Sequence, residues 1–474
     1  MLTARPGGGT IRRMTTTTTI EAFDLVVIGG GNAGVAAAGV ARRAGWRVAV
    51  VEEDLLGGTC PNRGCVPKKV LVAACEVVDH ARRAQGHGVT GELRIDWDAL
   101  QARRRSIVEP IPARTEASLA QNGTELVRGR ARFVAPRTIA VTAAASAAPT
   151  ERQLSGRKVV IATGSTPRPL TFPGAELVAT SDEFLAMPRV PRTAAFVGAG
   201  VIGMELSHVL ARAGCERVVL LELGPRALPQ ADADVVAALV EHGRTLGIEL
   251  RTGVQIRAVA REGDRVAVEL AEDGGERLVV DRVFHGAGRV PRLDGLDLHA
   301  AGLTLERGRV ALGPDLRCTE DESVAIVGDA APGLPQLSPL ATSLGRLVGK
   351  NLVEDRRDAP DLAAVPSCVY TLPSLAQVGL TEAQAKDRGL EVTVKRTEGM
   401  TGWISARTHH EACAFAKVLI GADGRLVGAH LLGHGAEETI HLFAMAMRHG
   451  ISAAELAAGD AAYPTFSSDV RWLL

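Results

Sequence analysis

Two cysteines close together in the sequence are the residues with the clearest capacity for chemistry. Cys60 and Cys65 lie in the segment GGTCPNRGCVPKK, which runs from Gly57 to Lys69. An apolar, strand-like run ends just before this segment at Glu52, and a helical pattern (VLVAACEVV) follows it. The sequence therefore predicts that the pair stands at the start of a helix.

A disulfide between these cysteines requires a departure from regular helix geometry. Residues five apart in a helix have Cα atoms roughly 8–9 Å apart, whereas a disulfide usually requires less than about 7 Å. Gly64 and Pro67 are residue types that permit a distorted first turn. The helix dipole, together with Lys68 and Lys69, favours a thiolate at this position. These features indicate a redox-active disulfide rather than a structural one.

The same segment resembles the active-site segment of the flavoprotein disulfide reductases, which include glutathione reductase, dihydrolipoamide dehydrogenase and mercuric reductase. The cysteine spacing, the preceding glycines and the trailing Pro-Lys-Lys all match. The resemblance implies that Cys60 exchanges with the substrate, that Cys65 forms the charge-transfer thiolate against the flavin, and that Gly58 and Thr59 contact the cofactor. A structural disulfide or half of a metal site is the alternative. No second cysteine pair with metal-ligand spacing exists to complete such a site, so we predict no resident metal.

A glycine-rich fingerprint precedes the cysteine pair. The text FDLVVIGGGNAGVAAAGVARRAGWRVAVVEED, from Phe23, predicts a strand, a glycine turn, a helix and a second strand. Gly29, Gly31 and Gly34 follow G-x-G-x-x-G, and Glu52 ends the second strand. The glycines let the backbone and the helix N-terminus approach a pyrophosphate, and the acid is placed for a ribose hydroxyl. The family resemblance assigns this unit to FAD.

A second complete fingerprint begins at Thr193, with the text TAAFVGAGVIGMELSHVLARAGCERVVLLE. Its glycines are Gly198, Gly200 and Gly203, and its acid is Glu222. Two fingerprints imply two dinucleotides, of which one is a nicotinamide. An acid at the ribose favours NADH, although Arg226 four residues beyond it leaves NADPH open.

The resemblance supplies further expected site residues. Thr163 and Gly164 in RKVVIATGSTPRPL, and Asp329 in SVAIVGDAAP, match segments that bind FAD in the family. Gly288 in VFHGAGRVPRL lies on the return from the nicotinamide domain and is expected to contact a cofactor. Glu205 is expected to pair with Lys68 beside the flavin, the alternative being a solvated helix glutamate.

The expected fold class is α/β, with two Rossmann-like dinucleotide-binding domains (FAD and NAD(P)) and a C-terminal α+β dimerisation domain. The last of these keeps the family's Val-Gly-Leu-Thr-Glu at Val378 to Glu382, which implies a homodimer. The expected division is a disordered tail over 1–20, the FAD-binding domain over 21–165 and 286–355, the NAD(P)-binding domain over 166–285, and the interface domain over 360–474.

Composition narrows the class of partner. The chain has 474 residues, of which 46% are hydrophobic and 23% charged, and its 54 Lys and Arg balance 54 Asp and Glu. Balanced charge produces no net electrostatic field that would attract nucleic acid or an anionic membrane. No apolar run approaches the ~18 residues of a membrane span. Seven cysteines in so long a chain fit a reducing compartment. We expect a cytoplasmic protein with a small-molecule substrate; Met14 is an alternative start.

The C-terminal text AAYPTFSSDVRWLL departs from the family's His-Pro-x-x-x-Glu. Tyr463 stands at the position of the acid-base histidine, and Ser468 at that of the glutamate, with Asp469 next to it. A phenol with a reference pKa near 10 is a poorer proton shuttle at pH 7 than an imidazole near 6.5. Such groups contribute ~10²–10⁴ in rate, so efficient turnover of glutathione or lipoamide is in doubt. Tyr463 is either a participant in the chemistry or a packing residue.

Three functions are therefore open. The favoured one is an FAD enzyme in which NAD(P)H, through flavin and the Cys60–Cys65 disulfide, reduces a disulfide or another small oxidant. The second is a mercuric-reductase-like metal or quinone reductase assisted by Tyr463, although the C-terminal cysteine pair of mercuric reductases has no counterpart here. The third is a flavin-binding redox sensor or subunit with little turnover. The sequence does not identify the terminal acceptor.

Overall fold

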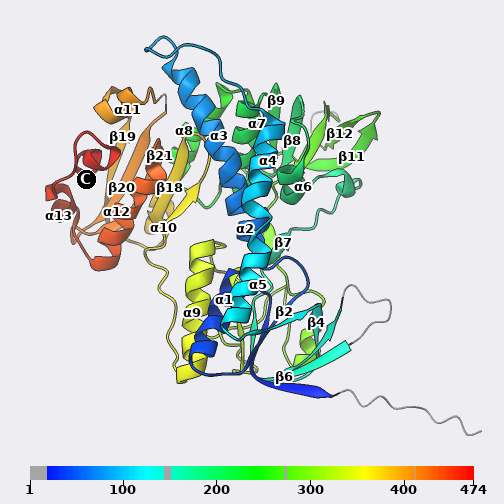
Figure 1. Ribbon diagram of the computed structural model, residues 1–474. Helices are drawn as coiled ribbons and strands as arrows, with labels where there is room; N and C mark the ends of the chain where they lie inside the picture. The colour runs from blue at the N-terminus through cyan, green and yellow to red at the C-terminus, as the bar shows by residue number, and fades with distance from the viewer. Residues whose placement is uncertain (1–18, 144–150, 272–274, 412) are drawn as a thin grey trace, which may run out of the picture.

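The computed structural model describes residues 19–143, 151–271, 275–411 and 413–474. It has the α/β architecture predicted from the sequence, with two parallel sheets and a C-terminal antiparallel sheet (Figure 1). The predicted disordered tail lies almost wholly outside the described residues, and the first strand begins at Ile20.

The first sheet has the order β3-β2-β1-β6-β5-β4, with β16 paired to β6. Strands β1, β2, β3, β6 and β16 are parallel, and β4 and β5 form an antiparallel extension. Helices α1 and α9 pack on each other at one face, although they lie far apart in sequence (Figure 1). The elements are β1 (Ile20–Ile28), α1 (Asn32–Arg43), β2 (Val48–Glu52), β3 (Glu125–Arg128), β4 (Arg130–Ala135), β5 (Thr138–Thr142), β6 (Glu151–Ile161), β16 (Val324–Ile326) and α9 (Ser338–Glu354).

Helices connect this sheet to the rest of the molecule. Helix α3 is the longest of those described and packs against α4 and α7, so it reaches from the first sheet into the second half of the chain. The helices are α2 (Thr59–Arg63), α3 (Cys65–Ala84), α4 (Trp97–Val108), α5 (Ile111–Gln121) and α6 (Ser181–Ala186).

The second sheet is parallel, with the order β10-β9-β8-β14, and a three-stranded antiparallel sheet β11-β12-β13 accompanies it. The short strands β7 and β15 pair where the chain enters and leaves this unit. The elements are β7 (Ser165–Pro167), β8 (Thr193–Val197), α7 (Val201–Ala213), β9 (Arg217–Glu222), α8 (Ala233–Arg244), β10 (Ile248–Thr252), β11 (Ile256–Glu262), β12 (Arg265–Leu270), β13 (Arg277–Val280), β14 (Arg282–His285) and β15 (Arg289–Pro291).

The C-terminal sheet is antiparallel, with the order β17-β18-β21-β20-β19, and α12 packs on β18 and β21. A hairpin with Asp423-Gly424 at its turn joins β20 and β21, and Gly424 has a φ of 76°. The elements are β17 (Ser367–Val369), β18 (Ser374–Gly379), α10 (Glu382–Asp387), β19 (Val392–Glu398), α11 (Ile404–Thr408), β20 (Phe415–Gly421), β21 (Leu426–Gly433), α12 (Ala436–His449) and α13 (Ala453–Ala458).

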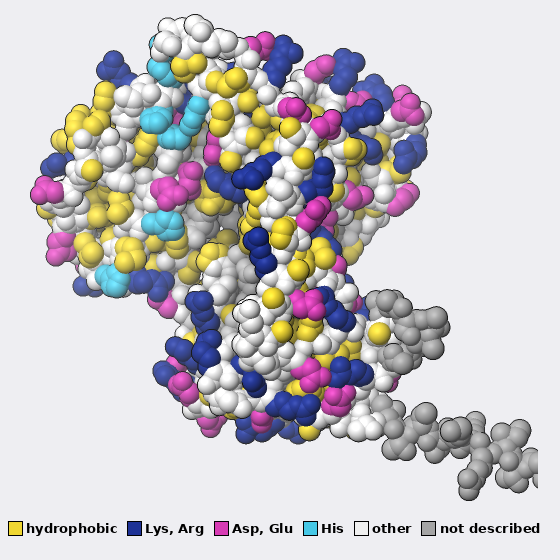
Figure 2. All heavy atoms as spheres, in the orientation of Figure 1, with side chains coloured by type: hydrophobic (Ala, Val, Ile, Leu, Met, Phe, Trp, Pro, Cys, Tyr) yellow, Lys and Arg dark blue, Asp and Glu magenta, His cyan; other side chains and the backbone are white. Residues whose placement is uncertain are grey.

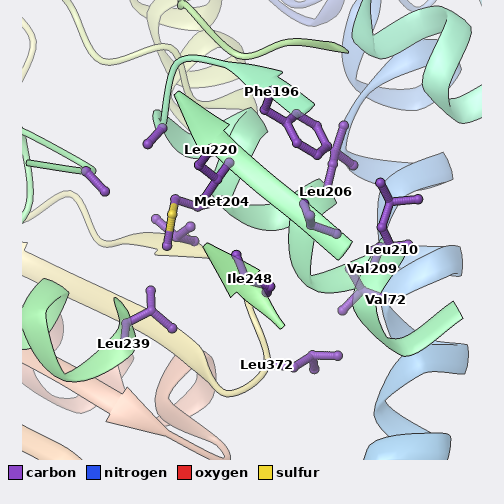
Figure 3. Close-up of a cluster of buried hydrophobic side chains, with 14 of the residues drawn as sticks. Val72, Phe196, Met204, Leu206, Val209, Leu210, Leu220, Leu239, Ile248 and Leu372 are labelled. Atoms are coloured by element: carbon purple, nitrogen blue, oxygen red, sulfur yellow. The ribbon is translucent and has the colours of Figure 1, made fainter. Parts of the chain in front are cut away.

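One hydrophobic cluster joins the helix that follows the cysteines to the other two units. Val72 of α3 lies with Leu206 and Val209 of α7 and with Leu372, which follows β17 (Figure 3). Arg212 of α7 is buried at the same junction, where it forms an ion pair of 2.9 Å with Asp79 of α3. Burial of apolar surface contributes roughly 25 cal/mol per Å², so this cluster fixes α3, and with it Cys65, relative to the second sheet.

The described surface carries charges of both signs. On the face drawn in Figure 2, basic and acidic side chains are interspersed, which agrees with the balanced composition. Among the residues that the structure describes, no helix is both long enough and apolar enough to span a membrane.

Candidate functional site

The distortion that the cysteine pair requires lies at Gly64. Helix α2 carries Cys60 and ends before Gly64, whose φ and ψ are −146° and −113°, and α3 then begins with Cys65. A Cβ at Gly64 would lie 3.3 Å from the Cα of Cys60, so glycine allows the two cysteines to approach. Both are free cysteines in the structure.

The two sulfurs differ in acidity. The pKa of Cys65 is lowered to about 6, chiefly because the Cys60 thiol donates a hydrogen bond to it, with Ser338 and Lys68 adding to the effect. The pKa of Cys60 is raised, first by the same contact and then by burial. The reduced pair therefore carries one negative charge at neutral pH, and this charge lies on Cys65.

Lys68 and Glu205 meet as the sequence predicts. The Lys68 Nζ lies 2.7 Å from the Glu205 Oε1, and the two side chains are 15% and 4% exposed. The same carboxylate oxygen accepts the backbone N–H of Tyr370 at 2.8 Å. The Tyr370 ring also lies 4.5 Å from the Lys68 Nζ. The ion pair thus joins α3, α7 and the end of β17 one turn beyond Cys65.

A cavity that is open to solvent lies beside the cysteines. Its walls include eight of the residues predicted to bind FAD, contributed by both segments assigned to that domain. These are Gly29, Gly31, Glu52, Gly58, Thr59, Thr163, Gly164 and Asp329. Cys60 and Ser338 line the same cavity and Cys65 does not, so the place for a flavin cofactor is contiguous with the cysteine segment at Cys60.

The cavity has features that fit a dinucleotide. Gly31 precedes α1 without a side-chain cap, which leaves the first N–H groups of the helix available to an anion. A Cβ at Gly58 would lie 2.8 Å from the Cα of Gly31, so Gly58 must stay without a side chain. The Oδ1 of Asn62, which lines the cavity, is buried without a protein partner and could accept a hydrogen bond from a ligand.

Glu52 and Gly34 hold the glycine turn in shape. Glu52 accepts the N–H of Gly30 at 2.8 Å and that of Asp54 at 2.9 Å. Gly34 does not line the cavity; a Cβ there would collide with the carbonyl oxygen of Gly29. Its function is therefore close packing of α1 on the turn.

Asp329 also lines the cavity. Its Oδ2 accepts a hydrogen bond from the Ser165 hydroxyl at 3.1 Å, and burial raises its pKa. The Thr163 hydroxyl instead donates to the carbonyl of Arg292 at 2.6 Å. Both residues are thus fixed by partners from the neighbouring strands.

The second fingerprint repeats the geometry of the first. Glu222 accepts the N–H of Ala199 at 2.7 Å and that of Gly224 at 2.8 Å. A Cβ at Gly203 would lie 2.5 Å from the carbonyl oxygen of Gly198. Gly200 precedes α7 without a side-chain cap, as Gly31 does before α1.

Gly288 lies apart from the glycine turn of this second unit. It follows β14, has a φ of 91°, and its carbonyl accepts the N–H of Arg168 at 3.0 Å. The residue that packs against the turn is Gly286, where a Cβ would lie 2.6 Å from the carbonyl oxygen of Gly198.

The C-terminal residues do not reach the cysteines of their own chain. The C-terminal segment lies on the outer side of the antiparallel sheet, away from α2 (Figure 1). Tyr463 is 75% exposed. Ser468 caps its own segment, with its hydroxyl donating to the Thr465 carbonyl at 2.6 Å, and Asp469 accepts a hydrogen bond from Ser405. The substitutes for the family's glutamate are therefore engaged within their own domain.

Sequence reasoning missed Ser338, Tyr370 and Gly286. Ser338 begins a helix that the sequence indicates, but no local pattern places its hydroxyl against Cys65. Tyr370 follows a short strand and meets Lys68 only through the tertiary fold. Gly286, two residues before Gly288, could have been found from the Gly-Ala-Gly run that follows an apolar strand.

Comparison with known proteins agrees with this geometry. The family model described as pyridine nucleotide-disulphide oxidoreductase matches residues 23–345, and the dimerisation-domain model of the same family matches residues 365–474. The chain therefore belongs to this family and is a class I flavoprotein disulfide reductase. Members of the family use FAD and NAD(P)H.

Individual relatives cover nearly the whole chain. A dihydrolipoyl dehydrogenase of Chlorobaculum tepidum is 32% identical, over 95% of this chain and 96% of the relative. A glutathione reductase of Burkholderia cepacia is 31% identical, over 94% and 97%. The HOCl-induced flavoprotein disulfide reductase RclA of Escherichia coli, in its Cu(II) complex, superposes with a TM-score of 0.85 at 25% identity, covering 96% of this chain and 99% of that chain.

Proposed function

We propose that this oxidoreductase takes electron pairs from NADH, holds them in the reduced Cys60–Cys65 pair and delivers them to a small oxidant. The observation that carries the proposal is that Cys60 lines the same cavity as the residues that fit FAD, while Cys65 is acidic enough to be a thiolate. When bound, FAD supplies the relay of electron pairs between a nicotinamide and a disulfide. The residues that would hold it are the glycine turn, Glu52 and Asp329.

The acidity of the two sulfurs gives each a separate role. Two electrons and one proton that reach the oxidised pair cleave its S–S bond. Because its pKa is raised, Cys60 retains the proton, and Cys65 retains the negative charge. When Cys60 later loses its proton and reacts with an oxidant, the S–S bond forms again and two electrons leave.

The nature of the oxidant follows from the missing acid-base pair. Reduction of a disulfide creates two thiolates, of which the leaving one must be protonated by a positioned acid. Tyr463 supplies a phenol where the family has an imidazole, and Ser468 and Asp469 are engaged elsewhere. An oxidising metal ion needs no such acid, because two Cu(II) ions and the reduced pair, one thiol and one thiolate, give two Cu(I) ions, the disulfide and one proton. The Cu(II) complex of RclA supports a metal ion as the small oxidant.

The quaternary structure and the nicotinamide belong to the same proposal. The dimerisation domain and the exposure of Tyr463 and Trp472, at 75% and 68%, support a homodimer in which this segment faces the partner's cysteine pair.

Glu222 at the end of β9 supports NADH over NADPH, because a 2′-phosphate beside a carboxylate is unfavourable.

An anaerobic titration with NADH tests the proposal. We expect a long-wavelength charge-transfer band in the wild-type enzyme, its loss in Cys65→Ser, and its retention in Cys60→Ser, where the Cys65 thiolate remains. Cys75→Ser is the matched control, since Cys75 is fully buried on the same helix. A band that persists in Cys65→Ser contradicts the assignment.

The acceptor is then identified by steady-state NADH oxidation against Cu(II), mercuric ion, a quinone, glutathione disulfide and lipoamide. Turnover with a metal ion at least about tenfold above that with either disulfide is expected from the missing general acid. Equal or better turnover with glutathione disulfide or lipoamide excludes the metal-ion candidate. Flavin reduction without turnover for any acceptor would instead identify a redox sensor.

A further inference from the structure

We propose that the hydroxyl of Ser338 stabilises the Cys65 thiolate of the reduced pair by donating a hydrogen bond to its sulfur. The inference rests on the proposed function, in which that pair holds the electrons. It concerns a residue that belongs to neither the cysteine segment nor the glycine fingerprints.

The contact is direct. The Ser338 Oγ lies 3.4 Å from the Cys65 Sγ, a hydrogen-bonding distance for sulfur. The Ser338 carbonyl is already engaged, since it accepts the hydroxyl of Thr342 at 3.2 Å. Because a thiolate is an acceptor without a proton, the hydroxyl must be the donor in this pair.

The backbone around Ser338 also stabilises a negative charge on the Cys65 sulfur. Ser338 is the first residue of α9, which has 17 residues and no side-chain hydrogen bond at its N-terminal cap. The positive end of the helix dipole therefore also faces the sulfur. The hydroxyl adds a directional bond to a site that already favours an anion.

The other groups around Cys65 come from each neighbouring element. Cys60 lies on α2, Lys68 on the same helix as Cys65, Glu205 on α7 and Tyr370 after β17. Lys68 favours the thiolate but shares its charge with Glu205. The Tyr370 phenol is disfavoured as an anion, since burial raises its pKa to about 12. Ser338 thus adds a second neutral donor to the one that the Cys60 thiol supplies.

The contact also favours the reduced pair. A thiolate is a much stronger acceptor than a disulfide sulfur, because hydrogen bonds to charged groups are roughly twice as strong. The hydroxyl therefore stabilises the dithiol state more than the disulfide state. Its removal should raise the pKa of Cys65 from about 6 by about one unit. A tenfold shift of the equilibrium from the reduced pair toward the disulfide corresponds to a reduction potential lower by about 30 mV, because the couple transfers two electrons.

Site-resolved alkylation measures this pKa without reference to flavin or substrate. The reduced holoenzyme is treated with iodoacetamide over a range of pH, and tryptic peptides are quantified by mass spectrometry. Arg63 lies between the two cysteines, so Cys60 and Cys65 fall in different tryptic peptides. The variants are Ser338→Ala, which removes the hydroxyl, and Ser338→Thr, which keeps it.

We expect the Cys65 midpoint to rise by about one unit in Ser338→Ala and to stay near the wild-type value in Ser338→Thr. An unchanged midpoint in Ser338→Ala, with FAD still bound, overturns the inference. An equal rise in both variants also overturns it, because the cause would then be packing rather than the hydroxyl. Failure of the proposed function would appear separately, as a charge-transfer band that survives Cys65→Ser.

Discussion

The two glycine fingerprints have nearly the same internal geometry but differ in what faces them. In each unit an acid at the end of the second strand accepts two backbone N–H groups, at 2.8 and 2.9 Å for Glu52 and at 2.7 and 2.8 Å for Glu222. In each, an uncapped glycine precedes the helix. The shared part of the design is therefore a frame for a dinucleotide, and it does not determine the chemistry.

The difference lies in the loop that closes the first unit. Gly57 donates its N–H to the carbonyl of Gly30 at 2.9 Å, and this contact carries the cysteine segment directly to the first glycine turn. After Glu222 the chain instead turns through Gly224 and Arg226, with no reactive side chain in the equivalent segment. The first dinucleotide-binding unit thus suits a permanently bound cofactor beside a redox-active cysteine pair. The second suits a nicotinamide nucleotide that binds and dissociates in each catalytic cycle.

The largest expected effect comes from substituting the equivalent glycines Gly31 and Gly200 by valine. Both have negative φ, −83° and −74°, so a side chain is allowed by the backbone. A Cβ at Gly31 would lie 3.6 Å from Gly58, and one at Gly200 would lie 3.2 Å from Gly286. Gly31→Val should fold but lose FAD and all activity, because its side chain occupies the approach to the α1 N-terminus.

Gly200→Val should retain FAD but lose about 100-fold or more in apparent affinity for NADH, equivalent to about 3 kcal/mol. Visible absorbance gives the ratio of FAD to protein, and stopped-flow reduction gives the dependence on NADH; thermal melts by circular dichroism control for folding. Loss of FAD in Gly200→Val, or its retention in Gly31→Val, would reverse the assignment of the two units.

An intermediate effect is expected for Glu222→Ala. The Glu222 side chain accepts two backbone N–H groups, and it is the group placed for a ribose hydroxyl. Its removal should raise the Km for NADH about tenfold, or about 1.4 kcal/mol, and reduce the preference over NADPH. Steady-state kinetics with both nucleotides check this, with Glu249→Ala on the neighbouring strand β10 as the control. An unchanged Km would show that Glu222 only supports the turn.

Much of this organisation could be predicted from the sequence because local patterns encode it. Strand, glycine turn, helix and acid follow one another within each unit, so Gly29, Gly198 and both acids were found from spacing alone. The cysteine pair was found in the same way. The break at Gly64 follows from the length of a helical repeat, since a regular helix holds such cysteines too far apart.

The remaining part of the site could not be predicted, because it depends on contacts between segments far apart in sequence. Ser338 reaches Cys65 across 273 positions, and Tyr370 reaches Glu205 across 165. A serine that begins a helix has an ordinary explanation within its own helix, so the sequence gives no reason to select it. The engagement of Asp469 by Ser405 is likewise decided by tertiary packing.

The smallest expected effect tests the one basic residue that could reverse the nucleotide preference of the second unit. Arg226 follows Glu222 closely enough to suggest a phosphate ligand, but its guanidinium donates to the carbonyls of Leu228 and Pro229 at 3.0 and 2.7 Å. To contact a 2′-phosphate it must leave both, and hydrogen bonds from a charged group to such acceptors are worth about 1.5–3 kcal/mol. Arg226→Ala should therefore change the Km for NADPH by less than about twofold. A tenfold or greater rise for NADPH alone would show that the guanidinium turns to the phosphate and that the two units differ in their nucleotide as well as in their surroundings.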